Sequence, residues 1–215
     1  MTPEVLALHQ ADMCKKYSGG HVAADAMAGC GGNVIQMAQV FGHVTGIEIS
    51  SRRAGMMHAN VHIYQVQDRV SILCTDFFLA ASTLIADCIF VSPPWGGPAY
   101  SHSETFDILT SSIDGQKSVK DLLDVCLRVV QRTWGQKRRS DEYLGGKQGQ
   151  GQGQGRGTGV VALFLPRNTD LRQVESLVPP SMVWHVERNF VNGNLKGITV
   201  YCFPSQQIDK KCHQF

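Results

Sequence analysis

The feature that most constrains this chain is an alternation of short apolar runs and helical stretches along most of its length. Runs with the composition of buried strands cover residues 21–26, 43–49, 70–74, 87–92 and 159–165. Segments with apolar residues at helical spacing cover residues 3–16, 32–41, 50–64, 118–134 and 168–177, with Asn168 expected to cap the last. This order predicts βαβ units, and therefore a mostly parallel sheet covered by helices on both faces.

The C-terminal segment departs from the alternation. Residues 183–190 and 196–203 are both strand-like, and Asn192-Gly193-Asn194 between them is a turn signal typical of a β-hairpin. Two strands joined by a tight turn are antiparallel. We therefore expect an α/β fold with a mostly parallel seven-stranded sheet and one antiparallel strand near the C-terminus.

The composition fits one packed domain. Hydrophobic residues make up 43% of the 215 residues and charged residues 18%, which excludes a disordered chain. No apolar run approaches the roughly 18 residues of a membrane helix, and no signal-peptide pattern is present, so we expect a soluble, intracellular protein. The formal net charge of +2 is too small to steer nucleic acid by itself. No internal repeat suggests a solenoid.

A Gly/Gln-rich run at residues 145–157 stands apart from the rest of the chain. We expect residues 1–215 to form a single domain in which this run is a flexible insertion. A tolerated surface insertion is favoured over the alternative, a basic loop lying over the substrate edge of the sheet.

The cysteines and histidines do not predict a metal site or a disulfide framework. The seven cysteines are odd in number and form no C-x-x-C pair. Cys74, Cys88 and Cys202 lie in apolar runs, so we expect them to be buried as small hydrophobic residues. His58 and His62 are four residues apart on one expected helix, where two solvated histidines are favoured over metal ligands.

A glycine-rich turn, DAMAGCGG, follows the first expected strand at residues 25–32. Gly29 and Gly31 allow the backbone to pass close to a ligand. Glu48 ends the second strand, 23 residues after Asp25, where a carboxylate can accept hydrogen bonds from both ribose hydroxyls of an adenosine cofactor. Together these features predict an adenosine-cofactor site.

The acidic first residue of this turn favours S-adenosylmethionine over NAD. A carboxylate at Asp25 repels the pyrophosphate of a dinucleotide but can bind the ammonium group of a methionine moiety. Asp76, after the third strand, is placed to accept a hydrogen bond from the adenine amino group, while Phe77 packs against the ring.

The strongest chemical signal is Ser92-Pro93-Pro94-Trp95 at the end of the fourth strand. It resembles the motif of amino-methyltransferases that methylate a planar exocyclic nitrogen. The lone pair of such a nitrogen is delocalised, so hydrogen bonds from its N–H groups to the Ser92 hydroxyl and the Pro93 carbonyl would aim it at the methyl group. The prolines stiffen the backbone, and Trp95 stacks on the flat substrate. The alternative is a rigid turn with no chemical role.

With its flanking segments, the chain resembles the trimethylguanosine synthase family, which hypermethylates the 7-methylguanosine cap of RNA. The matching segments are Thr2-Pro3-Glu4, residues 25–36, Glu48, Asn60, Asp76 and Phe77, and residues 92–100, 104–108, 165–168 and 189–196. The resemblance implies a Rossmann-like, S-adenosylmethionine-dependent methyltransferase fold without a metal. It also implies methyl transfer to N2 of the cap guanine, giving dimethyl- or trimethylguanosine.

The resemblance also implies roles for individual residues. Asp25, Glu48 and Asp76 would hold S-adenosylmethionine, with Glu48 replacing an expected aspartate, while Ser92 and Pro93 orient the guanine N2 and Trp95 stacks on the base. The positions that match contacts to the cap base or its phosphates are Asn60, Tyr100, Arg167 and Lys196. In this family, residues before the Thr-Pro-Glu segment help to cover the cofactor and the cap, and the present sequence begins at that segment.

The partner implied by the resemblance is m7G-capped RNA, of small nuclear or small nucleolar type. A monomer without a membrane association is expected, in the nucleus by family resemblance, with the cytoplasm as the alternative. The residue chemistry agrees with the substrate, because 7-methylguanine is cationic and tryptophan is the best partner for a cation–π interaction. Two alternatives stay open: an enzyme acting on adenine N6 or a glutamine amide, and a non-catalytic cap-binding module.

Overall fold

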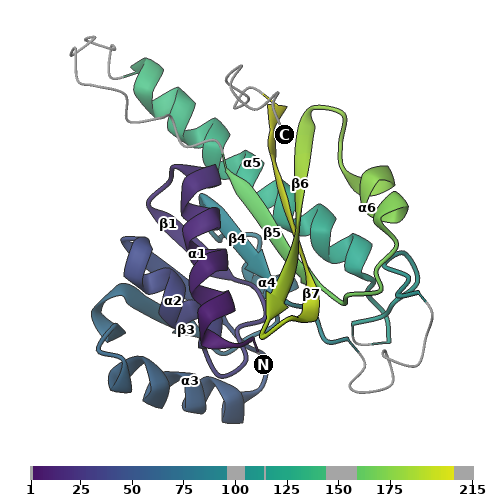
Figure 1. The fold of residues 1–215 in the computed structure, drawn as a ribbon. Helices are drawn as coiled ribbons and strands as arrows, with labels where there is room; N and C mark the ends of the chain where they lie inside the picture. Colours follow the sequence, from purple (N-terminus) through teal and green to yellow (C-terminus); the bar gives the residue numbers. More distant parts are fainter. Residues whose placement is uncertain (1, 96–104, 114, 144–158, 206–215) are drawn as a thin grey trace.

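The computed structural model describes residues 2–95, 105–113, 115–143 and 159–205. Seven strands of these residues form one sheet in the order β3-β2-β1-β4-β5-β7-β6 (Figure 1). The strands are β1 Val22–Asp25, β2 His43–Ile47, β3 Val70–Leu73, β4 Cys88–Val91, β5 Val160–Leu165, β6 Met182–Val191 and β7 Asn194–Pro204. Strand β7 runs antiparallel to both of its neighbours, and the pairs from β3 to β5 are parallel. The predicted fold class is confirmed.

Helices cover both faces of the sheet, as Figure 1 shows. The helical segments are α1 Glu4–Ser18, α2 Gly32–Val40, α3 Ser51–Ile63, the 3₁₀ turn η1 Gln67–Arg69, α4 Phe77–Ala80, α5 Val119–Tyr143 and α6 Leu171–Leu177. Helix α1 packs beside α2 and against β4, β5 and β7, whereas α5 packs against β4 and β5 on the opposite face. Among the described residues, no helix combines the length and the apolar composition needed to cross a lipid bilayer.

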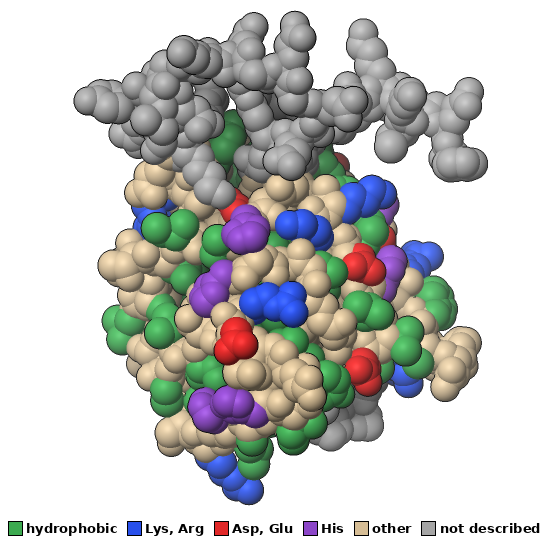
Figure 2. Space-filling model, turned by 90° about the vertical axis from the view of Figure 1, so that its left-hand side faces the viewer, with side chains coloured by type: hydrophobic (Ala, Val, Ile, Leu, Met, Phe, Trp, Pro, Cys, Tyr) green, Lys and Arg blue, Asp and Glu red, His purple; other side chains and the backbone are tan. Residues whose placement is uncertain are grey.

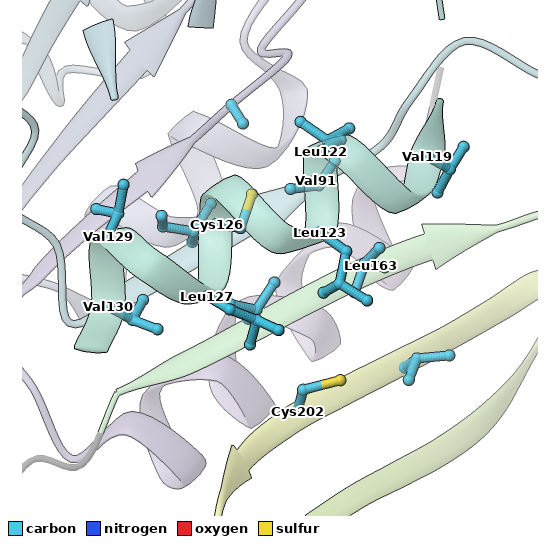
Figure 3. Close-up of a cluster of buried hydrophobic side chains, with 14 of the residues drawn as sticks. Val91, Val119, Leu122, Leu123, Cys126, Leu127, Val129, Val130, Leu163 and Cys202 are labelled. Carbon is cyan, nitrogen blue, oxygen red and sulfur yellow. The ribbon is translucent and has the colours of Figure 1, made fainter. Parts of the chain in front are cut away.

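The central strands are apolar on both sides because helices bury both of their faces. Along β4, Cys88 and Phe90 belong to the cluster under α1 and α2, while Ile89 and Val91 belong to the cluster under α5. Figure 3 shows this second cluster, in which the apolar stripe of α5 lies over β4, β5 and β7. A continuous apolar run in the sequence is therefore what a strand buried on both faces requires.

Three expectations about local structure are wrong. Helix α5 extends beyond Trp134 to Tyr143, because no proline or turn signal stops it. The N-cap of α6 is Asp170, whose Oδ1 accepts from the Arg172 N–H at 3.0 Å, and not Asn168. Cys74 is exposed, since it follows β3 at the edge of the sheet, whereas Cys88 and Cys202 are buried as expected.

The sheet order places a topological switch point between β1 and β4. Strand β1 is followed in the chain by β2 on one side, while its other neighbour is β4. The segments that leave the carboxyl ends of β1 and β4 therefore diverge and leave a crevice, the usual ligand position in open α/β sheets. Asp25 ends β1, and Ser92 follows β4 directly.

A buried hydrogen-bond chain joins the first helix to the last strands. The Gln10 side chain on α1 donates to the Thr199 hydroxyl of β7 at 2.9 Å and accepts from the Asn33 amide of α2 at 3.0 Å. Thr199 in turn donates to the Asn189 side chain of β6 at 2.6 Å. All four side chains are buried, so each needs these partners.

Candidate active site

A cavity of about 710 Å³ lies at the switch point. It is bounded by the glycine loop after β1, the Ser92–Trp95 segment after β4, the start of α1 and the start of β7. The residues that line it are Thr2, Pro3, Asp25, Met27, Ala28, Gly29, Cys30, Gly32, Asn33, Arg53, Ser92, Pro93, Pro94, Trp95, Phe164 and Lys196. Six of the predicted site residues are thus brought together.

Asp25 places a buried carboxyl group in the wall of this cavity. Its Oδ1 accepts a hydrogen bond from the Met27 N–H at 3.1 Å. Burial raises the pKa of Asp25 to about 7, with the neighbouring negative charge of Glu48 adding to this and the Met27 hydrogen bond opposing it. A cationic ligand group beside this carboxyl would stabilise its ionised form.

The glycine loop is held in place by side chains of α3 and by Glu48, which follows β2. Gly29 and Gly31 have φ values of 55° and 89°, a region that favours glycine. A Cβ at Gly31 would lie 2.7 Å from the Cγ of Met57, so packing on α3 also requires glycine there. The Asn60 amide donates to the Cys30 carbonyl at 2.8 Å. In this structure Asn60 therefore fixes the loop, whereas its expected contact is with the cap base.

Glu48 lies behind the loop, where its carboxylate accepts several hydrogen bonds. Its donors are the Gly29 N–H at 2.9 Å, the Ser50 N–H at 2.8 Å and the Arg53 guanidinium at 2.6 and 2.9 Å. Burial alone would raise the pKa of Glu48, but the hydrogen bonds from Arg53, Ser50 and Gly29 outweigh it and lower the pKa. The carboxylate is thus kept charged beside the cavity wall that Arg53 helps to form.

Asp76 and Phe77 lie further along the same sheet edge, after β3. The Asp76 carboxylate caps α4 through the Phe78 N–H at 2.8 Å and is 3.2 Å from the Lys117 ammonium group. Phe77 is only 3% exposed and packs in the core on the α5 side, whereas the neighbouring Phe78 lies under the Lys117 ammonium at 4.2 Å. Neither of the two predicted residues is part of the cavity wall described above.

The wall opposite the glycine loop includes Ser92, Pro93 and Trp95, the residues that we expect to bind the methyl acceptor. Pro93 is buried, and Ser92 and Trp95 are half-buried. The Trp95 ring packs on Phe164 of β5, with ring centroids 5.1 Å apart and planes tilted by 59°. Lys196, at the start of β7, adds a positive charge to the same wall.

The remaining predicted residues have other positions. Arg167 follows β5 and is exposed outside the cavity wall, and Tyr100 lies outside the described residues. The sequence analysis missed Asn33, Arg53 and Phe164. Arg53 could have been found as a cation in the first turn of the helix after Glu48, but only the strand order reveals that Phe164 neighbours Trp95.

Fold and site together define a Rossmann-like, S-adenosylmethionine-dependent methyltransferase. The O-methyltransferase of Bacillus cereus, solved in complex with SAH, matches the fold with a TM-score of 0.59 at 12% sequence identity, over 94% of this chain and 82% of that one. Residues 20–205 match the family described as RNA cap guanine-N2 methyltransferase, and the chain belongs to this family.

Two curated relatives carry the name trimethylguanosine synthase. The protein of Schizosaccharomyces pombe is 29% identical over 217 residues, which cover 98% of this chain and 77% of the relative. The protein of Saccharomyces cerevisiae is 32% identical over 210 residues, which cover 92% of this chain but only 56% of the relative.

The residues of the cavity fit the cofactor of this family. A buried carboxyl group at Asp25 suits the ammonium group of S-adenosylmethionine, and Gly29 and Gly32 leave open space where side chains would otherwise project. Within the described parts of the chain, no group of three His, Cys, Asp or Glu side chains is arranged to hold a metal ion.

Proposed function

We propose that this chain transfers methyl groups from S-adenosylmethionine to the exocyclic N2 of 7-methylguanosine RNA caps. One observation carries the proposal: a single cavity combines the Asp25 carboxyl group with Ser92, Pro93 and Trp95. A cofactor with an ammonium group at its amino-acid end and a flat acceptor base can therefore meet between these two walls.

The chain's own residues supply binding and orientation. Asp25 binds the ammonium group of the cofactor, and Glu48 accepts hydrogen bonds from its ribose, with Asp76 as the acceptor for adenine. When bound, S-adenosylmethionine supplies a methyl group on a sulfonium, which is already a good leaving group. Holding the two reactants in line is then the main contribution of the protein.

Ser92 and Pro93 act on the acceptor nitrogen. The Ser92 hydroxyl and the Pro93 carbonyl accept hydrogen bonds from the N2 amino group, which turns its lone pair toward the methyl carbon. The two residues would thereby present N2 to the methyl group that the cofactor supplies when bound, and the proton that N2 loses on methylation would pass to water.

Trp95 and Lys196 select the cap. Trp95 stacks on the methylated base, whose positive charge strengthens the interaction by about 2 kcal/mol when it is desolvated. Lys196 contacts the cap phosphates, and Asn60, Tyr100 and Arg167 are further candidates from the family resemblance. On the face drawn in Figure 2, described basic side chains are scattered among acidic, histidine and apolar ones. The described basic side chains of this face therefore form no continuous stripe of the kind that a long RNA groove would need.

The finer part of the proposal rests on the family resemblance. We propose capped small nuclear or small nucleolar RNA as the substrate, a monomeric enzyme and a nuclear site of action. Methylation of capped RNAs of both types and gel filtration of the purified chain test the first two of these points.

Incubation with isotope-labelled S-adenosylmethionine and either m7GTP or GTP tests the proposed reaction. We expect label in m7GTP, at N2 by fragmentation mass spectrometry, and much less in GTP. Equal labelling of both nucleotides would remove the cap from the proposal. Cofactor binding without transfer to m7GTP, but with transfer to an adenine-containing RNA or a glutamine peptide, would favour the alternative amino-methyltransferases.

A further inference from the structure

The Trp95 ring depends on a residue that the proposed reaction does not use. Phe164 on β5 is 4% exposed, yet it lines the cavity and lies 5.1 Å from the Trp95 ring, centroid to centroid. Trp95 follows two prolines, so its backbone is stiff but its side chain still needs a surface to fix its rotamer. The Phe164 ring is such a surface.

Phe164 is itself held in place by a glycine. A Cβ at Gly197 would lie 2.7 Å from Cε2 of Phe164 and 2.6 Å from the Leu165 carbonyl oxygen. Real Cβ atoms do not approach other atoms so closely, so β7 needs glycine at this point if the ring of Phe164 is to keep its position. Lys196, the residue just before, is the cation of the same cavity wall.

We infer that Phe164, seated against Gly197, is a positioning residue that holds the Trp95 ring for stacking and so sets the preference for the methylated base. The inference rests on the proposed function. A cation–π interaction needs the cation over the ring face, within about 6 Å of its centroid. If the indole of Trp95 were free to turn, its ring face would be aligned with the cationic base of m7GTP for only part of the time. Hydrophobic contact with the neutral base of GTP depends less on this alignment.

Phe164 has a matched control in the same core cluster. Phe90 lies on the neighbouring strand β4, is 1% exposed and packs in the same cluster as Phe164. Replacing either ring by leucine removes similar apolar contact from the core. Of these two rings, only that of Phe164 is paired with Trp95.

The test compares Phe164→Leu, Phe90→Leu and the parent protein by calorimetric titration with SAH, m7GTP and GTP. For Phe164→Leu we expect the m7GTP affinity to fall about three- to tenfold, the range of an aromatic pair contact. SAH and GTP affinities should stay within twofold of the parent values, an order-of-magnitude margin for a site left intact. Phe90→Leu should lower the melting temperature without changing the m7GTP/GTP ratio.

A spectroscopic readout follows Trp95 directly. The emission of Trp95, taken as the difference between each protein and its Trp95→Phe derivative, should shift to the red in Phe164→Leu but not in Phe90→Leu. Gly197→Ala, which displaces the Phe164 ring, should repeat the loss of m7GTP preference if the variant folds.

The outcomes separate the two proposals. An unchanged m7GTP/GTP ratio in Phe164→Leu, or an equal fall in Phe90→Leu, would overturn the positioning role. A parallel loss of SAH affinity in Phe164→Leu would overturn it too, because the cavity as a whole would then have changed. A parent protein that binds GTP and m7GTP equally would instead refute cap selectivity, before any variant is considered.

Discussion

The two walls of the cavity are built from different interactions. The wall that we propose for the cofactor is the glycine loop with Asp25, and hydrogen bonds hold its backbone. Gly29 donates to Glu48, and Asn60 donates to the Cys30 carbonyl. The wall that we propose for the methyl acceptor is formed by Ser92, Pro93 and Trp95. There, consecutive prolines and ring packing on Phe164 hold the position of Trp95. Hydrogen-bonding groups suit the charged cofactor that we propose for the first wall, whereas the packed rings of the second would keep water away from a flat base. Changes to one wall should therefore leave binding at the other intact.

The largest difference between the effects on SAH affinity and on m7GTP affinity is expected for Asp25→Asn. Loss of the charge that faces the ammonium group should weaken SAH binding by about 100-fold, since hydrogen bonds to charged groups contribute about 1.5–3 kcal/mol. The m7GTP affinity should change little, and both are measured by calorimetry. Asp87→Asn is the control, because Asp87 is a buried carboxyl whose Oδ2 accepts from the His21 and Val22 N–H groups away from the cavity. A normal SAH affinity for Asp25→Asn would show that Asp25 does not bind the cofactor.

Trp95→Ala should produce the reverse pattern. We expect a loss of about 30-fold in m7GTP affinity, the equivalent of about 2 kcal/mol of cation–π attraction, with SAH binding retained. Trp184→Ala, on β6 and packed against the α5-side core, is the control for loss of an indole. Trp95→Phe should recover part of the preference. Equal losses of SAH and m7GTP affinity would mean that the walls are not independent.

Ser92→Ala should change turnover more than binding at either wall. Removal of one oriented hydrogen bond should lower kcat about tenfold. The SAH affinity and the KM for the capped substrate should stay near their parent values, as single-turnover and steady-state rates can show. Unchanged turnover would mean that the Ser92 hydroxyl does not hold the acceptor nitrogen.

The affinities for SAH and for m7GTP should also respond differently to pH. The pKa of Asp25 is raised from 3.8 to about 7 in the cofactor-free fold, so below pH 7 its carboxyl is protonated and must lose that proton to bind an ammonium group. SAH affinity should therefore fall by up to about tenfold per pH unit below 7, while m7GTP affinity stays level. Asp25→Asn should remove the slope. A level SAH profile in the parent protein would contradict this assignment.

Ionisation of the same carboxyl group should lower the stability of the cofactor-free fold, whereas it raises the affinity for SAH. A group whose pKa is raised on folding favours the fold at low pH, and this contribution is lost as pH rises through about 7. The Asp25→Asn variant should therefore gain stability relative to the parent between pH 5 and pH 8, by up to about 3 kcal/mol. Chemical denaturation of both proteins at the two pH values measures the difference.

The smallest effect is expected for Arg53→Met. The Arg53 side chain is 51% exposed, and Glu48 keeps the Gly29 and Ser50 N–H groups as partners after the change. We expect SAH affinity to fall about threefold, in keeping with a half-exposed ion pair. Arg52→Met, one residue earlier and also exposed, should have no effect. A loss as large as that of Asp25→Asn would place Arg53 in direct contact with the cofactor.

The sequence predicted the fold well because the central strands are buried on both faces. Their continuous apolar runs, separated by amphipathic helices, permit few other arrangements. The prediction of Asn168 as a helix cap was wrong at a place where segments distant in the sequence contact each other. Asn168 fails as a cap because its carbonyl accepts from the Phe106 N–H at 2.8 Å, and the adjacent Thr169 forms a bridge with Phe106. Local propensity at Asn168 contains no information about this contact.

Site residues were predictable from the sequence where each lies at the end of one strand. Asp25 is the last residue of one strand and Ser92 directly follows another, so the sequence could place both at the same sheet edge. The roles of Arg53 and Phe164 depend on which strands are neighbours and on side-chain directions, which one sequence does not specify. Asn60 matched the family pattern, but its hydrogen bond to the Cys30 carbonyl emerged only from the structure.

The hydrogen-bond chain through Gln10 has a consequence for synthesis on the ribosome. Gln10 and Thr199 are 189 residues apart, and Asn33, which Gln10 holds, lines the cavity. A nascent chain that has emerged only as far as β4 contains Asp25, the glycine loop and Ser92, but lacks Phe164, Lys196 and Thr199. Its buried amides would have no partner on β7, and the acceptor wall would be incomplete. The complete cavity can therefore form only after translation has passed β7, so a chain that ends before β7 lacks part of the wall that we propose for the cap.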